Sequence, residues 1–120
     1  MFKQESMYYL TGYDTFGFSM FQCLIIDGSG NTVLLTRLPD LRQAQFTSDI
    51  QDIRLWHDTE GVNPALELHG LLDDLGYRNK TLGIEFDSYG LKAHNWRLLE
   101  PQLDGFCTLV DASTLVDQFR

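Results

Sequence analysis

The spacing of apolar residues and turn residues in the first half of the chain predicts a β-hairpin followed by a helix. Residues 18–27 (FSMFQCLIID) are apolar on both faces of an extended strand, which is typical of a buried strand. The glycine-rich segment 27–31 (DGSGN) predicts a turn, and residues 32–37 (TVLLTR) predict the returning strand. A short polar helix is expected over 39–47, because a proline opens it and apolar residues recur one turn apart.

The segment after Asn63 predicts an amphipathic helix. Asparagine is a typical N-cap, and Pro64 fits the first turn because its missing N–H has no partner there in any helix. Four leucines follow at helical spacing and form one apolar stripe: Leu68, Leu71, Leu72 and Leu75. Gly76 predicts a left-handed cap that ends the helix.

Strand and helix signals alternate through the rest of the chain. Strands are expected over 52–56, 81–86 and 105–110. Further helices are expected from Asp87 or Ser88 to about Glu100, where Pro101 stops the helix, and from Ser113 to the end. This alternation predicts an α/β layer fold, and the hairpin makes its sheet mixed.

Both ends of the sequence are expected to continue an element. Met1–Glu5 resembles the tail of a strand, and the last residues hold apolar positions that are still in helical phase. We therefore expect the 120 residues to be one domain from a longer chain.

The charge of the chain disfavours two kinds of partner. The net charge is −8 and the nine Lys and Arg form no cluster, which disfavours nucleic acids and anionic membrane surfaces. No apolar run approaches the roughly 20 residues of a membrane span, and no signal peptide is recognisable. Cys23 and Cys107 lie far apart in apolar segments, which favours two free thiols in a reducing cytosol over a disulfide or a catalytic thiol.

Motifs for catalysis are lacking. The histidines, His57, His69 and His94, belong to no H-E-x-x-H pair, and there is no C-x-x-C or G-x-S-x-G segment. The loop 57–60 (HDTE) is better explained as solvated than as a metal site. We therefore predict no catalytic and no metal-ligating residue within this sequence.

The aromatic stretch 7–16 (MYYLTGYDTF) leaves two interpretations open. Gly12 and Gly17 bracket residues 13–16, so the backbone can turn tightly there, and the rings of the stretch and of Phe18 cannot all point inward from a turn. Some of them can cover the sheet. The others can face a partner or ligand, since tyrosine suits a surface that is apolar at one end and wet at the other.

Three segments together resemble a known family. They are SMYYLTGYD (6–14), CLIIDGSGNTVLLTR (23–37) and LVDASTLVDQFR (109–120), with LGIEF between them supplying a G-x-E motif at Gly83 and Glu85. Their order is similar to that of the N-terminal domain of creatinase, prolidase and aminopeptidase P. The resemblance covers nearly the whole chain.

The resemblance implies a three-layer α/β/α domain with a mixed sheet and a ribonuclease-H-like arrangement. It also implies that an N-terminal helix and strand, and a C-terminal catalytic "pita-bread" domain, are absent from this sequence. That catalytic domain would hold two divalent metal ions (Mn, Co or Zn). By the same resemblance, the domain would build a dimer or tetramer and lend side chains to the active site of a neighbouring subunit.

Three residues are the candidates for that contact: Tyr8, Tyr13 and Phe18. Aminopeptidase P has a tryptophan where Tyr8 stands, and creatinase has a phenylalanine that aligns with Phe18. Creatinase also has a substrate-binding arginine that aligns with Met20, and methionine cannot replace it, so creatine is a poor candidate substrate.

The leading hypothesis is a non-catalytic N-terminal domain of a cytoplasmic Xaa-Pro dipeptidase or aminopeptidase P-like metallopeptidase, acting on a Xaa-Pro dipeptide-like substrate. Two alternatives are a free-standing module that binds a small ligand or a protein, and the same domain from a relative that hydrolyses a non-peptide amide. A self-contained small enzyme is the least favoured.

Overall fold

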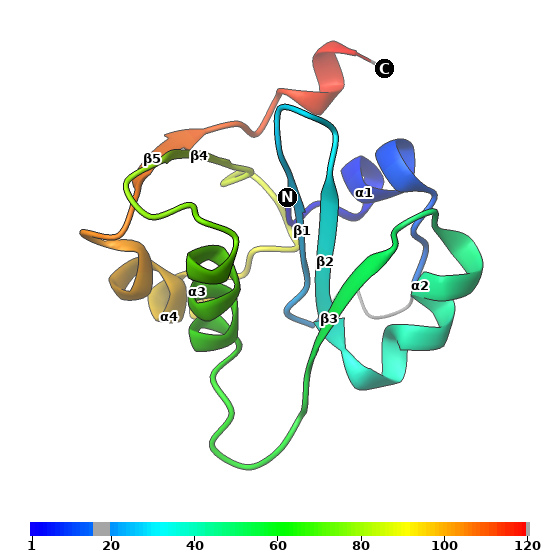
Figure 1. Cartoon of the computed structure of the whole chain (residues 1–120), viewed down its shortest axis with the longest axis horizontal. Coiled ribbons are helices and arrows are strands. Elements are labelled where there is room, and N and C mark those ends of the chain that lie inside the picture. Colours follow the sequence, from blue (N-terminus) through cyan, green and yellow to red (C-terminus); the bar gives the residue numbers. More distant parts are fainter. Residues whose placement is uncertain (16–19, 120) are drawn as a thin grey trace.

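The five strands of the structure, a computed structural model that describes residues 1–15 and 20–119, form two groups (Figure 1). The first is a three-stranded mixed sheet in the order β1 (Cys23–Ile26), β2 (Thr32–Arg37) and β3 (Asp52–Trp56). β1 is antiparallel to β2, and β2 is parallel to β3. The second group is a parallel pair, β4 (Thr81–Ile84) and β5 (Thr108–Asp111).

Helices flank the three-stranded sheet on both sides. α1 (Gln4–Thr11), the 3₁₀ turn η2 (Leu38–Asp40) and α2 (Leu41–Thr47) lie to the right of the sheet in Figure 1. α3 (Pro64–Asp74) and α4 (Ala93–Leu103) pack together to its left. A second 3₁₀ turn, η3 (Val116–Gln118), follows β5. The predicted mixed α/β layer fold is confirmed.

The alternation of side chains along the strands divides the core into two clusters. Cys23 and Leu35 point into a large cluster with Phe2, Trp56 and the leucines of α3 and α4. Their neighbours Leu24 and Leu34 point the other way, into a smaller cluster with Met7, Tyr13, Ala44 and Ile50. This period of two is the property of a strand that is covered on both faces.

Short-range signals predicted several elements correctly. The carboxylate of Asp27 accepts hydrogen bonds from the backbone N–H groups of Ser29 and Asn31 and closes the hairpin turn. Asn63 caps α3 by accepting from the N–H of Ala65 at 3.0 Å. Gly76, with φ of 84°, ends that helix in the left-handed conformation.

The expectation of a strand at Met1–Glu5 is wrong beyond its first residue. Met1 does pair with Leu24 of β1 through two backbone hydrogen bonds, of 2.7 and 2.9 Å. The helix α1 then begins at Gln4, although Lys3 at its N-cap offers no side-chain hydrogen bond to it. A distant residue, described below, instead accepts from the N–H groups of Phe2 and Lys3, just before the helix.

Two expected helices differ from the structure. Ser88 does not cap α4; its hydroxyl accepts from the N–H of Gly90 in a tight turn, and α4 begins at Ala93. Pro101 lies inside the last turn of α4, where it removes one helical hydrogen bond near the end. The expected final helix from Ser113 is reduced to the single turn η3.

The turn before α4 contacts the start of the chain closely at Gly90, and substitutions at Gly90 and at the unobstructed Gly70 test this contact. A Cβ on Gly90 would lie 1.9 Å from the carbonyl oxygen of Phe2, so the backbone must move. A Cβ on Gly70, an exposed residue within α3, would meet nothing within 4 Å. We expect Gly90→Ala to lower the free energy of unfolding by about 2 kcal/mol or more. Gly70→Ala should raise it by about 0.5–1 kcal/mol, because alanine is the better helix former.

Urea unfolding of both variants measures the two effects. Equal effects of the two substitutions would contradict the packing described here.

Candidate functional site

Helix α1 is held at its N-terminus by a carboxylate that is remote in sequence. Glu85 follows β4, is only 2% exposed, and accepts hydrogen bonds from the N–H groups of Phe2 and Lys3 at 2.9 and 3.0 Å. Its other oxygen accepts from the hydroxyl of Ser6 at 2.6 Å. A carboxylate at this end of a helix satisfies donors that lack helical partners and interacts favourably with the helix dipole.

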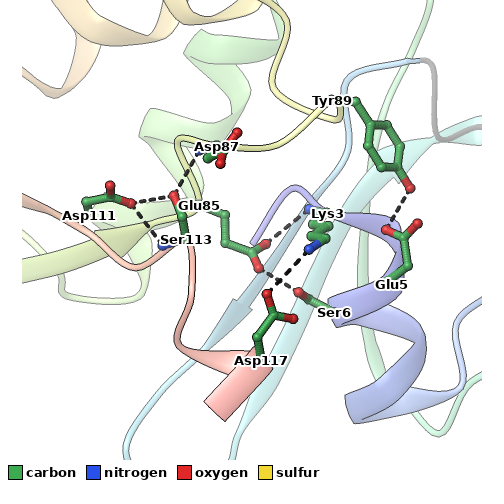
Figure 2. A network of polar contacts seen from close by, with 9 residues as sticks. All are labelled: Lys3, Glu5, Ser6, Glu85, Asp87, Tyr89, Asp111, Ser113 and Asp117. Carbon is green, nitrogen blue, oxygen red and sulfur yellow. Dashed lines mark hydrogen bonds and ion pairs between the residues drawn. The ribbon is translucent and has the colours of Figure 1, made fainter. Parts of the chain in front are cut away.

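Three further contacts tie α1 to neighbouring segments. Figure 2 draws two of them, together with the contacts of Glu85 with Lys3 and Ser6. The Tyr89 hydroxyl donates to Glu5 at 2.7 Å, and the Lys3 ammonium lies 3.7 Å from Asp117. The third contact joins the Tyr9 hydroxyl to the backbone carbonyl of Phe119 at 2.8 Å. The 3₁₀ turn after β5 and the loop after β4 therefore both rest against α1.

Aromatic side chains gather around this helix on the surface. Tyr8, Tyr9 and Tyr89 are 59%, 48% and 52% exposed, and Phe119 is 73% exposed. We call these four residues the α1 surface. An open depression beside them is lined by Gln4, Glu5, Tyr8, Tyr9 and Asp14. The exposed rings of the α1 surface thus lie beside the two carboxylates of the depression, Glu5 and Asp14. This combination suits a partner or ligand with both apolar and positively charged groups.

The electrostatics of Tyr89 reflect its contact with Glu5. Desolvation, and then the hydrogen bond to the Glu5 carboxylate and its negative charge, raise the pKa of Tyr89 to about 12. The phenol therefore stays protonated at neutral pH and remains a donor to Glu5.

The three predicted contact residues differ in how the structure places them. Tyr8 lies on the α1 surface, at the rim of the depression. Tyr13 is fully buried, and its hydroxyl lies 2.9 Å from the side-chain oxygen of Gln22 and 3.3 Å from that of Thr36. As placed here, Tyr13 packs the smaller cluster and does not reach the surface. Phe18 lies outside the described residues, and Met20 packs partly buried against the large cluster.

The described residues hold no group of three or more His, Cys, Asp or Glu side chains arranged to bind a metal ion. His57 and His94 are exposed, and His69 contacts Gln102 and the Phe106 ring. Cys23 and Cys107 are free thiols, as expected. This part of the chain therefore does not fit the two-metal centre that the resemblance implies for a catalytic domain.

Sequence reasoning noted Glu85 as part of a motif but missed its role. The signal in the sequence was an acidic residue directly after an apolar strand, in LGIEF. The ordinary interpretation of such a residue is an exposed side chain in a solvated loop. Its partners lie 79 to 83 positions away, so no local pattern could identify them.

Comparison with known proteins decides the family. Residues 1–120 match the family described as the Creatinase/Prolidase N-terminal domain. The chain belongs to this family. The resemblance noted from the sequence is confirmed over its full length.

Individual relatives place this domain in longer proteins. Ectoine hydrolase of Halomonas elongata is 29% identical over 123 residues, which cover 97% of this chain and 31% of the relative. A dipeptidase from Pyrococcus horikoshii OT3 has a similar structure, with a TM-score of 0.73, 22% identity and coverage of 98% of this chain and 30% of that chain. The chain thus spans about a third of the length of both proteins.

An isolated domain gives the same fold. The N-terminal domain of the cytoplasmic peptidase PepQ from Mycobacterium tuberculosis H37Rv matches with a TM-score of 0.68 at 20% identity, over 100% of this chain and 84% of that chain. Within the described residues, no helix is long and apolar enough to cross a membrane.

Replacement of Glu85 by alanine tests its role in this creatinase/prolidase-type domain. Two backbone N–H groups and one hydroxyl would lose their charged acceptor in a buried place. We expect Glu85→Ala to lower the free energy of unfolding by about 2–3 kcal/mol. The control is Glu100→Ala, an exposed glutamate on α4, which should change it by less than about 0.5 kcal/mol. Similar small effects in chemical denaturation would rule out the anchoring role.

Alkaline pH should destabilise the domain through its buried Tyr13. Burial, the largest cause, raises the pKa of Tyr13 above its ordinary value of 10.0. Because the folded state has the higher pKa, this contribution is fully present below pH 10 and is lost as pH rises above it. We expect the free energy of unfolding to fall as pH rises above 10. The fall should be smaller in Tyr13→Phe and unchanged in Tyr8→Phe, the exposed control.

Proposed function

We propose that this chain is the non-catalytic N-terminal domain of a cytoplasmic hydrolase whose active site lies in a second, C-terminal domain. The family match over residues 1–120 supports this proposal, as does the chain's coverage of only about a third of the relatives. The second domain would hold two divalent metal ions, Mn, Co or Zn. In the intact protein the catalytic domain would contact the present domain. The present domain would also join two or four subunits.

The α1 surface is the part of the domain that we assign to the neighbouring subunit. Its rings are exposed although α1 itself is fixed by Glu85, Glu5 and Lys3. Rigid aromatic side chains on a fixed helix lose little conformational entropy on contact, which makes them effective binding residues. Tyr8 has the largest exposure of the α1 tyrosines, and we propose that it reaches the substrate pocket of the next subunit.

Phe18 is kept in the proposal as a second residue of that pocket, on the resemblance alone. Tyr13 is not kept, because its hydroxyl and ring are enclosed by the core. Its burial fixes the chain just after α1, so it supports Tyr8 indirectly.

Two substrate classes remain in the proposal. A Xaa-Pro dipeptide is favoured by the likeness to N-terminal domains of peptidases, although their identities to this chain show the fold alone. A non-peptide amide is the alternative, because ectoine hydrolase is 29% identical over almost the whole chain. Assay of the full-length protein, loaded in turn with Mn²⁺, Co²⁺ and Zn²⁺, against a Xaa-Pro dipeptide and against ectoine distinguishes the two classes.

The substitution Tyr8→Ala in the full-length protein tests the assignment of the α1 surface. Loss of a ring that contacts substrate should raise KM about tenfold, which corresponds to about 1.4 kcal/mol of binding free energy. The metal content should stay unchanged. Phe46→Ala is the matched control, since this ring is 88% exposed on α2 and lies outside the α1 surface.

Steady-state kinetics and metal analysis on the same preparations give both quantities. A loss of bound metal with an unchanged KM in Tyr8→Ala would contradict the proposal, as would equal changes in the two variants.

A further inference from the structure

The open depression beside the α1 surface combines aromatic rings with carboxylates. Its lining residues are Gln4, Glu5, Tyr8, Tyr9 and Asp14, and its volume is about 610 Å³. Both polar ends of the Gln4 side chain are used inside the domain, since its amide donates to the Tyr13 carbonyl and its oxygen accepts from Gln22. The charged groups that a ligand meets here are therefore the carboxylates of Glu5 and Asp14.

These two carboxylates lack a cationic partner within the described part of the chain. Residues 1–36 contain a single Lys or Arg, and this residue, Lys3, places its ammonium 3.7 Å from Asp117. Neither Glu5 nor Asp14 takes part in an ion pair among residues 1–15 and 20–119. Two like charges beside one depression create a negative potential there, which attracts a positively charged group.

The helix dipole explains the place of Glu5 but not that of Asp14. Glu5 lies in the first turn of α1, where the dipole favours a carboxylate. Asp14 follows the C-cap Gly12, at the end of the same helix where a carboxylate is disfavoured. The bonds between Asp14 and Thr47 use the backbone groups of Asp14, so they leave its carboxylate exposed. A cation bound in the depression would offset this unfavourable placement.

The groups around the depression are held in place before any ligand binds. The Tyr89 hydroxyl donates to Oε2 of Glu5 at 2.7 Å, whereas Oε1 accepts no hydrogen bond from the described residues (Figure 2). The Tyr9 hydroxyl donates to the Phe119 carbonyl at 2.8 Å, which limits the motion of its ring. Groups that are already ordered lose little conformational entropy on binding, and tyrosine rings attract cations to their faces.

We propose that this depression binds a positively charged nitrogen of the substrate, an ammonium or an amidinium group. The proposal rests on the function proposed above, in which Tyr8 reaches the substrate pocket of the next subunit. The Glu5 and Asp14 carboxylates supply the opposite charge, and the rings of Tyr8 and Tyr9 supply cation–π contacts. The two acids are thus specificity residues that select substrates by charge and take no part in bond cleavage.

Both substrate classes of the proposed function carry such a nitrogen. A Xaa-Pro dipeptide has an ammonium at its amino end, and ectoine has a cyclic amidinium. A lysine or arginine of the neighbouring subunit is the other cation that fits the charge of the depression. The size of the depression favours the substrate, because 610 Å³ lies within the roughly 300–1,000 Å³ of small-molecule sites.

Titration of the 120-residue chain with benzylammonium, followed by NMR, tests the preference for charge. Benzyl alcohol is the neutral control of nearly the same size and shape. We expect benzylammonium to bind about tenfold more tightly at neutral pH, with chemical-shift changes at the amides of Tyr8, Tyr9 and Asp14. Glu5→Gln and Asp14→Asn should each weaken benzylammonium about threefold and leave benzyl alcohol unchanged.

The same substitutions in the full-length protein test the contact with substrate. We expect Glu5→Gln and Asp14→Asn each to raise KM for a cationic substrate about threefold at unchanged kcat, because each removes one charge from the binding site and none from the reaction. Glu100→Gln removes an exposed charge from α4 and is the matched control. It should change neither KM nor the affinity for benzylammonium.

The outcomes separate this inference from the proposed function. Equal affinities for benzylammonium and benzyl alcohol would overturn the inference. An unchanged KM in Glu5→Gln and Asp14→Asn would also overturn it, and the proposed function would stand if Tyr8→Ala still raised KM. An unchanged KM in all three variants would overturn both. Weaker subunit association at unchanged KM would assign the depression to a lysine or arginine of the neighbouring subunit and would overturn the inference.

Discussion

The buried carboxylate of Glu85 is the constraint on which the arrangement of this domain depends. A charge that is 2% exposed is tolerated only when donors replace its water, and here the N–H groups of Phe2 and Lys3 and the hydroxyl of Ser6 do so. Phe2 and Lys3 lie directly before α1 and Ser6 lies in its first turn, whereas Glu85 directly follows β4. One side chain thus joins the two groups of strands and fixes the helix that carries the exposed rings.

The fixed position of α1 explains why its two faces have different properties. Ser6, Met7 and Thr11 are buried, so the inner face is defined by packing and by the Glu85 contact. Tyr8 and Tyr9 then point outward by helical geometry, since they occupy the positions between the buried ones. Both interpretations of the aromatic stretch therefore describe part of it: Tyr13 packs the core, while the tyrosines of α1 form a surface.

Local patterns predicted those elements whose causes are local. The hairpin follows from Asp27 and the glycines beside it, and α3 follows from its asparagine cap and its leucine stripe. The start of α1 could not be predicted in this way, because the Lys3 side chain gives no cap and the carboxylate that accepts from the Lys3 N–H comes from residue 85. The same holds for Ser88, whose hydroxyl is used by a tight turn instead of a helix.

In the candidate site, too, local sequence predicts some features, and distant contacts decide the others. Exposure of the tyrosines could be argued from composition, but which of them face outward depends on the phase of a helix that the sequence did not predict. Tyr13 follows α1 directly, and its hydroxyl meets Gln22 and Thr36 from two other segments. A polar tip that finds partners inside the core removes the usual reason to place a tyrosine at a surface.

The separation of the strands into two groups has a physical consequence at Met1. Its terminal ammonium donates to the Leu24 carbonyl at 2.7 Å in a partly buried position beside an apolar groove. The next two residues, Phe2 and Lys3, bond through their N–H groups to Glu85 at the end of β4. One short segment therefore contacts β1 through its backbone and β4 through a buried carboxylate, so the two groups of strands are held together at the point where α1 begins.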